Sequence, residues 1–348
     1  MTTGDRPAPP TDCPKHMVHG PCGGVGTDGG CEVGDRRCPF VGAEPPPTPT
    51  PLASPRPPVA ASAELRGRLG QGRAVVADFP AAALDADSLR AAADVLRGAV
   101  DAVLAGDSPR ERVQFPPAYR AMLIRAAGLR VWSGVNCRDR NRVALEGELA
   151  ALADLGADAV HCVTGDHPVR GSRPDAAAVF DLDSTRVAAL AVRAGLLTSV
   201  AESPSAPPTD RRARRLTDKL AVGAEVCFVN HCGGTEAVRS FVDDVHDLGA
   251  APWFLPCVPI VLDVASARLL ASFPGLVLPD GYLDRILSAR DPRETGIRSA
   301  VELSEELLQL EGVAGVNLSG GGGPGEELRH ARALAEIGRR LAGVDRQC

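Results

Sequence analysis

The sequence predicts an α/β protein: a (β/α)8 TIM barrel preceded by a small cysteine-rich metal-binding module. Short apolar runs alternate with helical patterns eight times over about 280 residues, which matches the number of units and the size of such a barrel. Four of the ten cysteines crowd into the first 40 residues. The first apolar run leads into Ala77-Asp78-Phe79-Pro80 and not into G-x-G-x-x-G, which disfavours an open doubly wound sheet with a dinucleotide site.

Four segments follow one another along the chain. We expect a disordered tail at residues 1–12, the cysteine-rich module at 13–43, a proline-rich linker at 44–62 and the barrel at 63–345. Eight prolines fall between positions 45 and 58, and such a run is semi-extended and packs neither as a helix nor as a sheet. The linker therefore separates two folded parts.

The module has too few apolar residues to fold by burial alone, so its cysteines need another explanation. Cys13, Cys22, Cys31 and Cys38 follow a C-x8-C-x8-C-x6-C spacing, and a metal bound by their thiolates would supply the folding free energy. Four thiolates suit both zinc and an iron–sulfur cluster of the [4Fe-4S] type. The alternative is a flexible tail whose thiols are free or paired in disulfides.

The elements of the barrel follow in order. Apolar runs predict the eight strands at residues 74–79, 102–105, 132–135, 159–163, 196–201, 226–230, 252–260 and 313–318. Helical periodicity predicts helices at residues 88–98, 117–127, 143–155, 210–222, 235–248, 264–271, 281–289, 298–310 and 326–341. The arginines of the helix over 210–222 are most simply interpreted as a solvated face: Arg211, Arg212, Arg214 and Arg215.

Composition and charge exclude several classes of protein. A net charge of −6 and an aromatic content of 3% argue against nucleic-acid binding. No uninterrupted apolar run is long enough to span a membrane, and the N-terminus lacks the apolar core of a signal peptide, so we expect a cytoplasmic protein. The sequence contains no H-E-x-x-H, G-x-S-x-G or P-loop motif, so metalloprotease, serine hydrolase and P-loop kinase activities have no support.

Polar side chains gather where the predicted strands end. In a parallel barrel these ends meet on one face, where barrel enzymes bind their ligands. The residues concerned are Asp78, Asp107, Asn136, Asp139, Thr164, Asp166, His167, Glu202, Asn230, His231 and Ser319. Lys219 adds a basic residue on the helix after the fifth strand. The set predicts a ligand site at the mouth of the barrel.

Asp166 is the first candidate within this set. Gly165 before it lets a ligand approach the backbone closely, and a carboxylate there can stabilise a cation or orient a ring. The alternative is an aspartate that caps a helix or a turn. Asn230 either hydrogen-bonds a heterocycle or ends its strand. The glycines at 320–323 and 325 either present amides to a phosphate or form a plain loop, and His161 is expected in the core.

The stretch from 132 to 168 resembles the methylenetetrahydrofolate reductase family. Its pattern C-R-D-R-N-R-x-A-L … T-G-D-x-P is matched by Cys137 to Arg142, Ala144-Leu145 and Thr164 to Pro168, and weaker similarity extends over residues 74–320. The module resembles a cysteine-rich domain of some bacterial members, with a C-P-K … G-P-C-G-G … C-E-V … C pattern. In those members it usually follows the barrel, whereas here it precedes it.

This resemblance implies a flavin-dependent oxidoreductase of one-carbon and methionine metabolism, which reduces 5,10-methylenetetrahydrofolate to 5-methyltetrahydrofolate. FAD would lie at the strand ends and receive electrons from NAD(P)H or a ferredoxin-type iron–sulfur donor; a homo-oligomer is compatible with the resemblance. The residues implied to bind the flavin are Asn136, Thr164, Gly165, Asp166, His167, Ala201, Glu202 and Lys219. Asp166 and Asn230 would bind the folate, and Asp166 and Asp78 are the candidate catalytic residues.

Two positions depart from the family's pattern. The family's acid on the first strand falls on Ala77, and the neighbouring Asp78 is expected to point to the opposite face of the strand. The family's aspartate on the helix after the fifth strand falls on Arg212. These departures favour an alternative: a folate-binding or methyl-transfer barrel that has lost the reductase activity.

Overall fold

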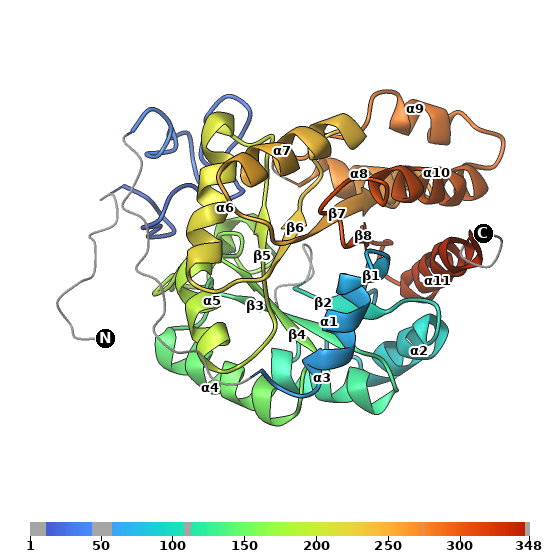
Figure 1. The fold of residues 1–348 in the computed structure, drawn as a ribbon, viewed down its shortest axis with the longest axis horizontal. Coiled ribbons are helices and arrows are strands. Elements are labelled where there is room, and N and C mark those ends of the chain that lie inside the picture. The colour runs from blue at the N-terminus through green and yellow to red at the C-terminus, as the bar shows by residue number, and fades with distance from the viewer. Residues whose placement is uncertain (1–11, 44–57, 108–112, 274, 345–348) are drawn as a thin grey trace.

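The computed structural model describes residues 12–43, 58–107, 113–273 and 275–344, which form a closed barrel ringed by helices and a small module beside its mouth (Figure 1). Nearly all of the predicted tail at residues 1–12 and most of the predicted linker at 44–62 lie outside the described residues. Among the described helices, none has the length and apolar character needed to cross a membrane.

Eight parallel strands close the barrel in sequence order, which confirms the predicted fold class. The strands are β1 Ala74–Asp78, β2 Ala102–Ala105, β3 Val131–Asn136, β4 Ala159–Val163, β5 Thr198–Glu202, β6 Val226–Val229, β7 Trp253–Pro259 and β8 Gly315–Ser319. The last strand pairs with the first, with Leu318 opposite Ala77. The sheet therefore has no free edge.

Helices follow the strands and cover the outside of the barrel (Figure 1). They are α1 Ser62–Gly70, α2 Ala86–Leu96, α3 Pro117–Ala126, α4 Arg142–Asp154, α5 Ser184–Arg193, α6 Arg212–Ala221, α7 Thr235–Asp247, α8 Val264–Ala271, α9 Tyr282–Leu287, α10 Pro292–Leu307 and α11 Glu327–Val344. Short 3-10 turns stand at Pro168–Arg170 and Thr209–Arg211.

The structure differs from the predicted helices in three places. Helices α1 and α5 were not predicted, and α1 contains Gly67 and Gly70, which lower its intrinsic helix propensity. Helix α10 begins at Pro292, before the predicted residue 298. Its start is explained by Asp291, whose side chain accepts the Glu294 N–H at 3.1 Å, and by a proline at the first helical position.

Side chains that point into the barrel form a compact core of their own. Trp132 and Phe228 meet edge to face there, with ring centroids 5.0 Å apart. Leu65 and Leu69 of α1 pack against the inward residues of the strand starts, so α1 closes the N-terminal end of the barrel. Burial of each leucine contributes roughly 1.5–3 kcal/mol, which explains why a helix of weak propensity forms here.

The module, residues 12–43, folds around a small apolar cluster and lies on the mouth of the barrel. Met17, Val25 and Phe40 form the cluster, together with the side chains of Cys13 and Cys38. Isolated bridges join Val25 to Cys31 and Gly30 to Arg37. In Figure 1 the module, drawn in blue, lies beside α6. The Val18 N–H donates to Asp183 at the start of α5, and Arg212 of α6 donates to the Cys22 carbonyl.

Candidate functional site

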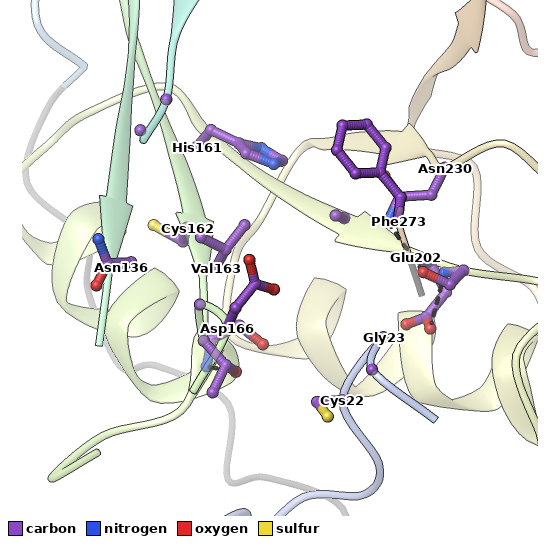
Figure 2. Close-up of a pocket in the computed structure, with 18 of the residues that line it drawn as sticks. Cys22, Gly23, Asn136, His161, Cys162, Val163, Asp166, Glu202, Asn230 and Phe273 are labelled. Carbon is purple, nitrogen blue, oxygen red and sulfur yellow. Dashed lines mark hydrogen bonds between the residues drawn. The ribbon is translucent and has the colours of Figure 1, made fainter. Parts of the chain in front are cut away.

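The carboxyl ends of the strands surround a pocket of about 400 Å³, here called the mouth pocket. Among the residues that line it are the predicted Asp78, Asn136, Thr164, Gly165, Asp166, Ala201, Glu202, Lys219 and Asn230. In Figure 2, Asn136 and Asp166 lie on one side, Glu202 and Asn230 lie on the other, and Cys22 of the module lies between them. The structure therefore brings most of the predicted site residues together.

The turn after β4 places Asp166 at the edge of the mouth pocket. Gly165 has φ +86°, and a Cβ on it would lie 3.1 Å from the Asn136 Cβ and 3.3 Å from the Arg138 Cβ. Only glycine fits this close approach without strain. Thr164 before it is held by two contacts: its Oγ1 accepts the Ser184 N–H at 3.1 Å and donates to the Met17 sulfur at 3.6 Å.

Asp78 points into the barrel, as its place among the polar strand ends predicted, whereas the orientation expected from the family's pattern is wrong. Ala77 is fully buried among the outward side chains that pack on the helices, whereas Val76 and Asp78 face inward. The alternation along the strand is regular, but the inward set is the opposite of the one that the family's pattern implied. Asp78 therefore lines the mouth pocket, and Ala77 cannot.

Three donors hold the Asp78 carboxylate. They are Asn317 Nδ2 at 3.0 Å, Ser319 Oγ at 2.9 Å and the Gly320 N–H at 3.1 Å. Burial raises the pKa of Asp78 above its ordinary value, and the three hydrogen bonds only partly oppose this effect. A carboxyl with a raised pKa, oriented by three donors at the pocket wall, is suited to holding a proton beside a ligand.

On the opposite wall Glu202 forms a buried ion triad. Its Oε2 lies 2.7 Å from Lys219 Nζ and its Oε1 lies 3.0 Å from Arg212 Nη1. Burial alone would raise the pKa of Glu202, but the charges of Lys219, Arg212 and Arg215 outweigh it and hold the pKa at about 2. Glu202 is therefore ionised, and the two cations beside it compensate its charge.

The interpretation of the α6 arginines as a solvated face is wrong for Arg212 and Arg215, which are 1% and 3% exposed. Arg212 also donates to the carbonyls of Ala206 and Pro207, at 2.6 and 2.7 Å, and Arg215 donates to Thr185 at 2.7 Å. The sequence pattern of α6 indicated a charged face, but the module and Glu202 cover the part of that face formed by Arg212 and Arg215. Arg214 remains exposed and fits the prediction.

Asn136 is oriented by its neighbours at the end of β3. Its amide nitrogen donates to Asp107, and its Oδ1 accepts the Arg138 N–H at 3.0 Å. The Arg138 guanidinium in turn lies 3.0 Å from Asp107 and 2.9 Å from Asp139. The C-R-D-R motif thus works partly by positioning Asn136, a role that the motif alone does not reveal.

Two buried histidines line the mouth pocket and stay neutral. Burial, aided by the Lys219 charge, lowers the pKa of His161 to about 3, and its Nδ1 lies 2.9 Å from Ser199 Oγ. Burial lowers the pKa of His231 to about 4. His161 is buried as predicted, but its position on the wall of the mouth pocket was not predicted. Neither imidazole adds positive charge to the pocket near neutral pH.

The module contributes residues to the mouth pocket that were not predicted for it, including Lys15, Pro21, Cys22, Gly23 and Gly24. Lys15 is 4% exposed, forms an ion pair with Glu32, and has its ammonium 6.0 Å from the Phe180 ring centroid. Burial alone would lower the pKa of Lys15, but Cys22, Glu32 and Asp166 raise it above its ordinary value. Lys15 belongs to the C-P-K motif and Glu32 to the C-E-V motif. These two motifs are the sequence feature from which their role could have been predicted.

Glu32 of this ion pair also joins the module to the carboxyl end of β4. Glu32 Oε1 accepts the His167 N–H at 2.9 Å. The His167 ring does not line the mouth pocket: it stacks on Phe180 with centroids 5.8 Å apart, and its Nδ1 accepts the Val169 N–H at 3.3 Å. Of the predicted site residues, His167 is thus engaged by the module instead of facing the pocket.

The cysteines of the module do not have the geometry of a metal site in this structure. Within the described chain, no three imidazole, thiol or carboxylate groups are arranged so that they could hold a metal ion. Burial raises the pKa of Cys13, and raises that of Cys38 to about 11, although backbone N–H groups of Met17 and Lys15 bond to Cys13. Zinc and the iron–sulfur cluster therefore stay predictions.

The groups assigned to FAD are largely engaged within the protein. Thr164 Oγ1 contacts Met17 of the module, and Glu202 and Lys219 neutralise one another. The side of the mouth pocket implied for the flavin is thus covered by the module, and its polar side chains do not fit a flavin as they stand. FAD also stays a prediction.

Comparison with protein families and with curated proteins gives two findings. A family described as "Methylene-tetrahydrofolate reductase C terminal" matches residues 6–44, so the resemblance of the module is confirmed, and this match does not extend to the barrel. No curated protein matches the chain.

Among solved structures, the barrel is similar to an uncharacterized protein from Clostridium thermocellum that binds two copies of 5-methyl-5,6,7,8-tetrahydrofolic acid. The TM-score is 0.58 at 14% sequence identity, over 79% of this chain and 99% of that one. A 2,3-dimethylmalate lyase of the PEP mutase/isocitrate lyase superfamily gives a TM-score of 0.42 at 15% identity, over 83% and 98%. At such identities the first similarity shows only that the fold is shared. The second is too weak to support any conclusion.

Proposed function

We propose that this protein binds a reduced folate in the mouth pocket. The observation that carries the proposal is the convergence of acidic and amide side chains there: Asp78 and Asp166, with Asn136 and Asn230. The pyrimidine edge of a pterin presents adjacent N–H donors beside a carbonyl acceptor. A carboxylate accepts two parallel N–H bonds, and an amide side chain can satisfy a donor and an acceptor together.

The charges around the pocket support a ligand that donates hydrogen bonds. Glu202 is compensated by Lys219 and Arg212, and the two histidines are neutral. In this proposal Asp166 binds the pyrimidine edge, and Asp78, whose pKa burial raises, holds a proton beside the ligand's ring nitrogens. The fold shared with a protein that binds 5-methyltetrahydrofolic acid adds support by analogy only.

The second candidate function is the reduction of 5,10-methylenetetrahydrofolate with FAD and electrons from NAD(P)H or an iron–sulfur donor. The matches to C-R-D-R-N-R and T-G-D-x-P favour it, as does the inward position of Asp78. The contact of Thr164 with Met17 of the module, and the pairing of Glu202 with Lys219, disfavour it. We therefore rank folate binding without reduction, in a carrier or methyl-transfer protein, above the reductase.

Titration calorimetry with 5-methyltetrahydrofolate tests the first proposal. We expect saturable binding that weakens by about 10- to 100-fold in Asp166→Asn, because a hydrogen bond to a charged group contributes about 1.5–3 kcal/mol. The matched control is Asp244→Asn on the exposed face of α7, which should leave the affinity unchanged. Absence of binding to the wild type would contradict the proposal.

The visible spectrum of the purified protein separates the two candidates. Flavin released on denaturation, together with turnover of 5,10-methylenetetrahydrofolate under a reduced donor, would establish the reductase. A colourless protein that binds 5-methyltetrahydrofolate without turnover would establish the binding function.

A further inference from the structure

A second cavity of about 770 Å³ opens beside the mouth pocket, at the ends of β8, β1 and β2. Both cavities are lined by Asp78, Leu104, Gly106, Asp107 and Phe273. The two cavities therefore adjoin at these residues. None of the described module residues lines the second cavity.

The walls of the second cavity are largely apolar and aromatic. Phe79 after β1, Phe115 before α3 and Phe273 after α8 line it, with Leu89 and Leu269 between them. Phe115 is held edge to face against Tyr119, with ring centroids 5.0 Å apart. Such walls suit a flat aromatic ring, because rings prefer offset and edge contacts with other rings.

The acidic groups of the second cavity already have partners. Asp85 caps α2 by accepting the N–H groups of Asp87 and Ser88, each at 2.9 Å. Glu327 accepts the Gly325 N–H at 3.1 Å. Asp107 lies 3.0 Å from Arg138 and also accepts from Asn136.

The polar groups left over are donors. Arg120 is the basic side chain among the described residues that line the cavity, and it is 7% exposed. It donates to the Ala105 carbonyl at 2.6 Å and to Gln114, and its Nη2 lies 3.9 Å from Asp107, while its Nε has no hydrogen-bond partner in the described structure. Within the described residues, the amides of Gly321, Gly322 and Gly323 donate no hydrogen bond either. A buried donor without an acceptor is unfavourable, so this arrangement suits a ligand that brings an anionic acceptor.

We infer that the second cavity binds the aminobenzoyl-glutamate tail of the reduced folate, with Arg120 and the Gly321–Gly323 amides holding a tail carboxylate. The inference rests on the proposed function, since the pterin of the same molecule lies in the mouth pocket. The aromatic ring of the tail lies between Phe79, Phe115 and Phe273. Arg120 is thus a specificity residue that distinguishes a folate from a free pterin.

The test compares two ligands by calorimetry on the full chain: 5-methyltetrahydrofolate and 6-methyltetrahydropterin, which lacks the tail. We expect the wild type to bind the folate at least about tenfold more tightly. Arg120→Gln should lower the affinity for the folate about tenfold and leave the affinity for the tetrahydropterin unchanged. The matched control is Arg298→Gln on the exposed face of α10.

A second variant guards against misfolding of Arg120→Gln, whose side chain also holds the β2 carboxyl end. Ala83 lines the cavity at its partly exposed rim, and Ala83→Trp should fill the cavity without touching the Arg120 contacts. It should weaken folate binding and spare the tetrahydropterin. Equal affinities of the wild type for the two ligands, or equal weakening of both in either folded variant, would overturn the inference.

Two further outcomes separate this inference from the proposed function. If the wild type binds the tetrahydropterin but gains nothing from the tail, the proposed function stands and the inference is wrong. If inorganic phosphate binds in an Arg120-dependent way while folate and pterin bind equally, the cavity belongs to a phosphate and the inference is again wrong. If neither folate nor pterin binds, both are wrong.

Discussion

The covered side of the mouth, at the ends of β4 to β6, and the open side, at the ends of β8, β1 and β2, carry similar polar residues in different states. On the covered side the module and α6 satisfy them: Glu202 has two cationic partners, and Glu32 and Lys15 pair above the β4 end. On the open side Asp78 has only neutral donors, and the Arg120 Nε has no partner in the described structure. The comparison teaches that a strand-end residue such as Glu202 becomes structural where a second segment covers it, whereas Asp166 at the edge of the covered side still lines the mouth pocket.

Removing one partner of the covered triad should have the largest effect. Arg212→Leu leaves the ionised Glu202 with one cation and frees the carbonyls of Ala206 and Pro207. We expect the free energy of unfolding to fall by about 3–5 kcal/mol, as for other buried pairs broken from one side. Urea denaturation measures it.

The control for this change is Arg214→Leu, on the same helix but with a side chain that is 56% exposed. Arg214→Leu should lower the free energy of unfolding by less than about 1 kcal/mol. Equal losses in the two variants would show that α6 tolerates no leucine and that the triad is not the cause.

The pH dependence of stability should differ in sign between the two sides. The folded pKa of Glu202 is about 2, against an ordinary 4.5, so its contribution is present above pH 4.5 and is lost as the pH falls toward 2. The loss is of order 3 kcal/mol. The folded pKa of Asp78 is raised, so its protonation instead favours the folded state as the pH falls toward 3.8.

Urea denaturation between pH 6 and pH 3 checks both signs. Glu202→Gln should reduce the loss of unfolding free energy as the pH falls. Asp78→Asn should increase that loss, because the Asp78 carboxyl, whose protonation favours the folded state, is gone. The same slope in both variants would contradict the assigned difference between the two sides.

The ion pair between Lys15 and Glu32 within the module should give the third effect in size. Lys15→Met leaves Glu32 buried without its cation, and Glu32→Gln removes the reverse interaction. In a double-mutant cycle we expect a coupling free energy of about 2 kcal/mol. Limited proteolysis of residues 12–43 reports the local stability of the module. A coupling near zero would show that this ion pair does not stabilise the module.

The turn at Gly165 should give the smallest effect on stability. Gly165→Ala places a Cβ at φ +86° and 3.1 Å from the Asn136 Cβ, so we expect a loss of about 1–2 kcal/mol. It should also weaken folate binding, since Asn136 and Asp166 shift. Gly147→Ala, in an open position of α4, should instead stabilise the protein by about 0.5–1 kcal/mol. Thermal unfolding of the two variants compares them, and a loss at both positions would argue against strain at the turn.

Much of the fold follows from local pattern. Apolar runs that alternate with helical periodicity predict the eight strands, because strand and helix periods are set by a few neighbouring residues. Helix α1 escaped prediction because its stability comes from Leu65 and Leu69 on the barrel floor, and these contacts involve residues distant in sequence. The predicted site residues meet because parallel strand ends share one face, although their roles as flavin or folate ligands stay predictions.

By itself, the sequence determined the barrel, the polar strand ends and the separate cysteine-rich module. The tertiary structure alone decided that Asp78 and not Ala77 faces inward, because barrel closure sets which of two alternating faces is inside. It also decided that Arg212 is buried, since its partner Cys22 is 190 residues away in the chain. Local periodicity contains no information about contacts over such separations, which depend on where the module docks.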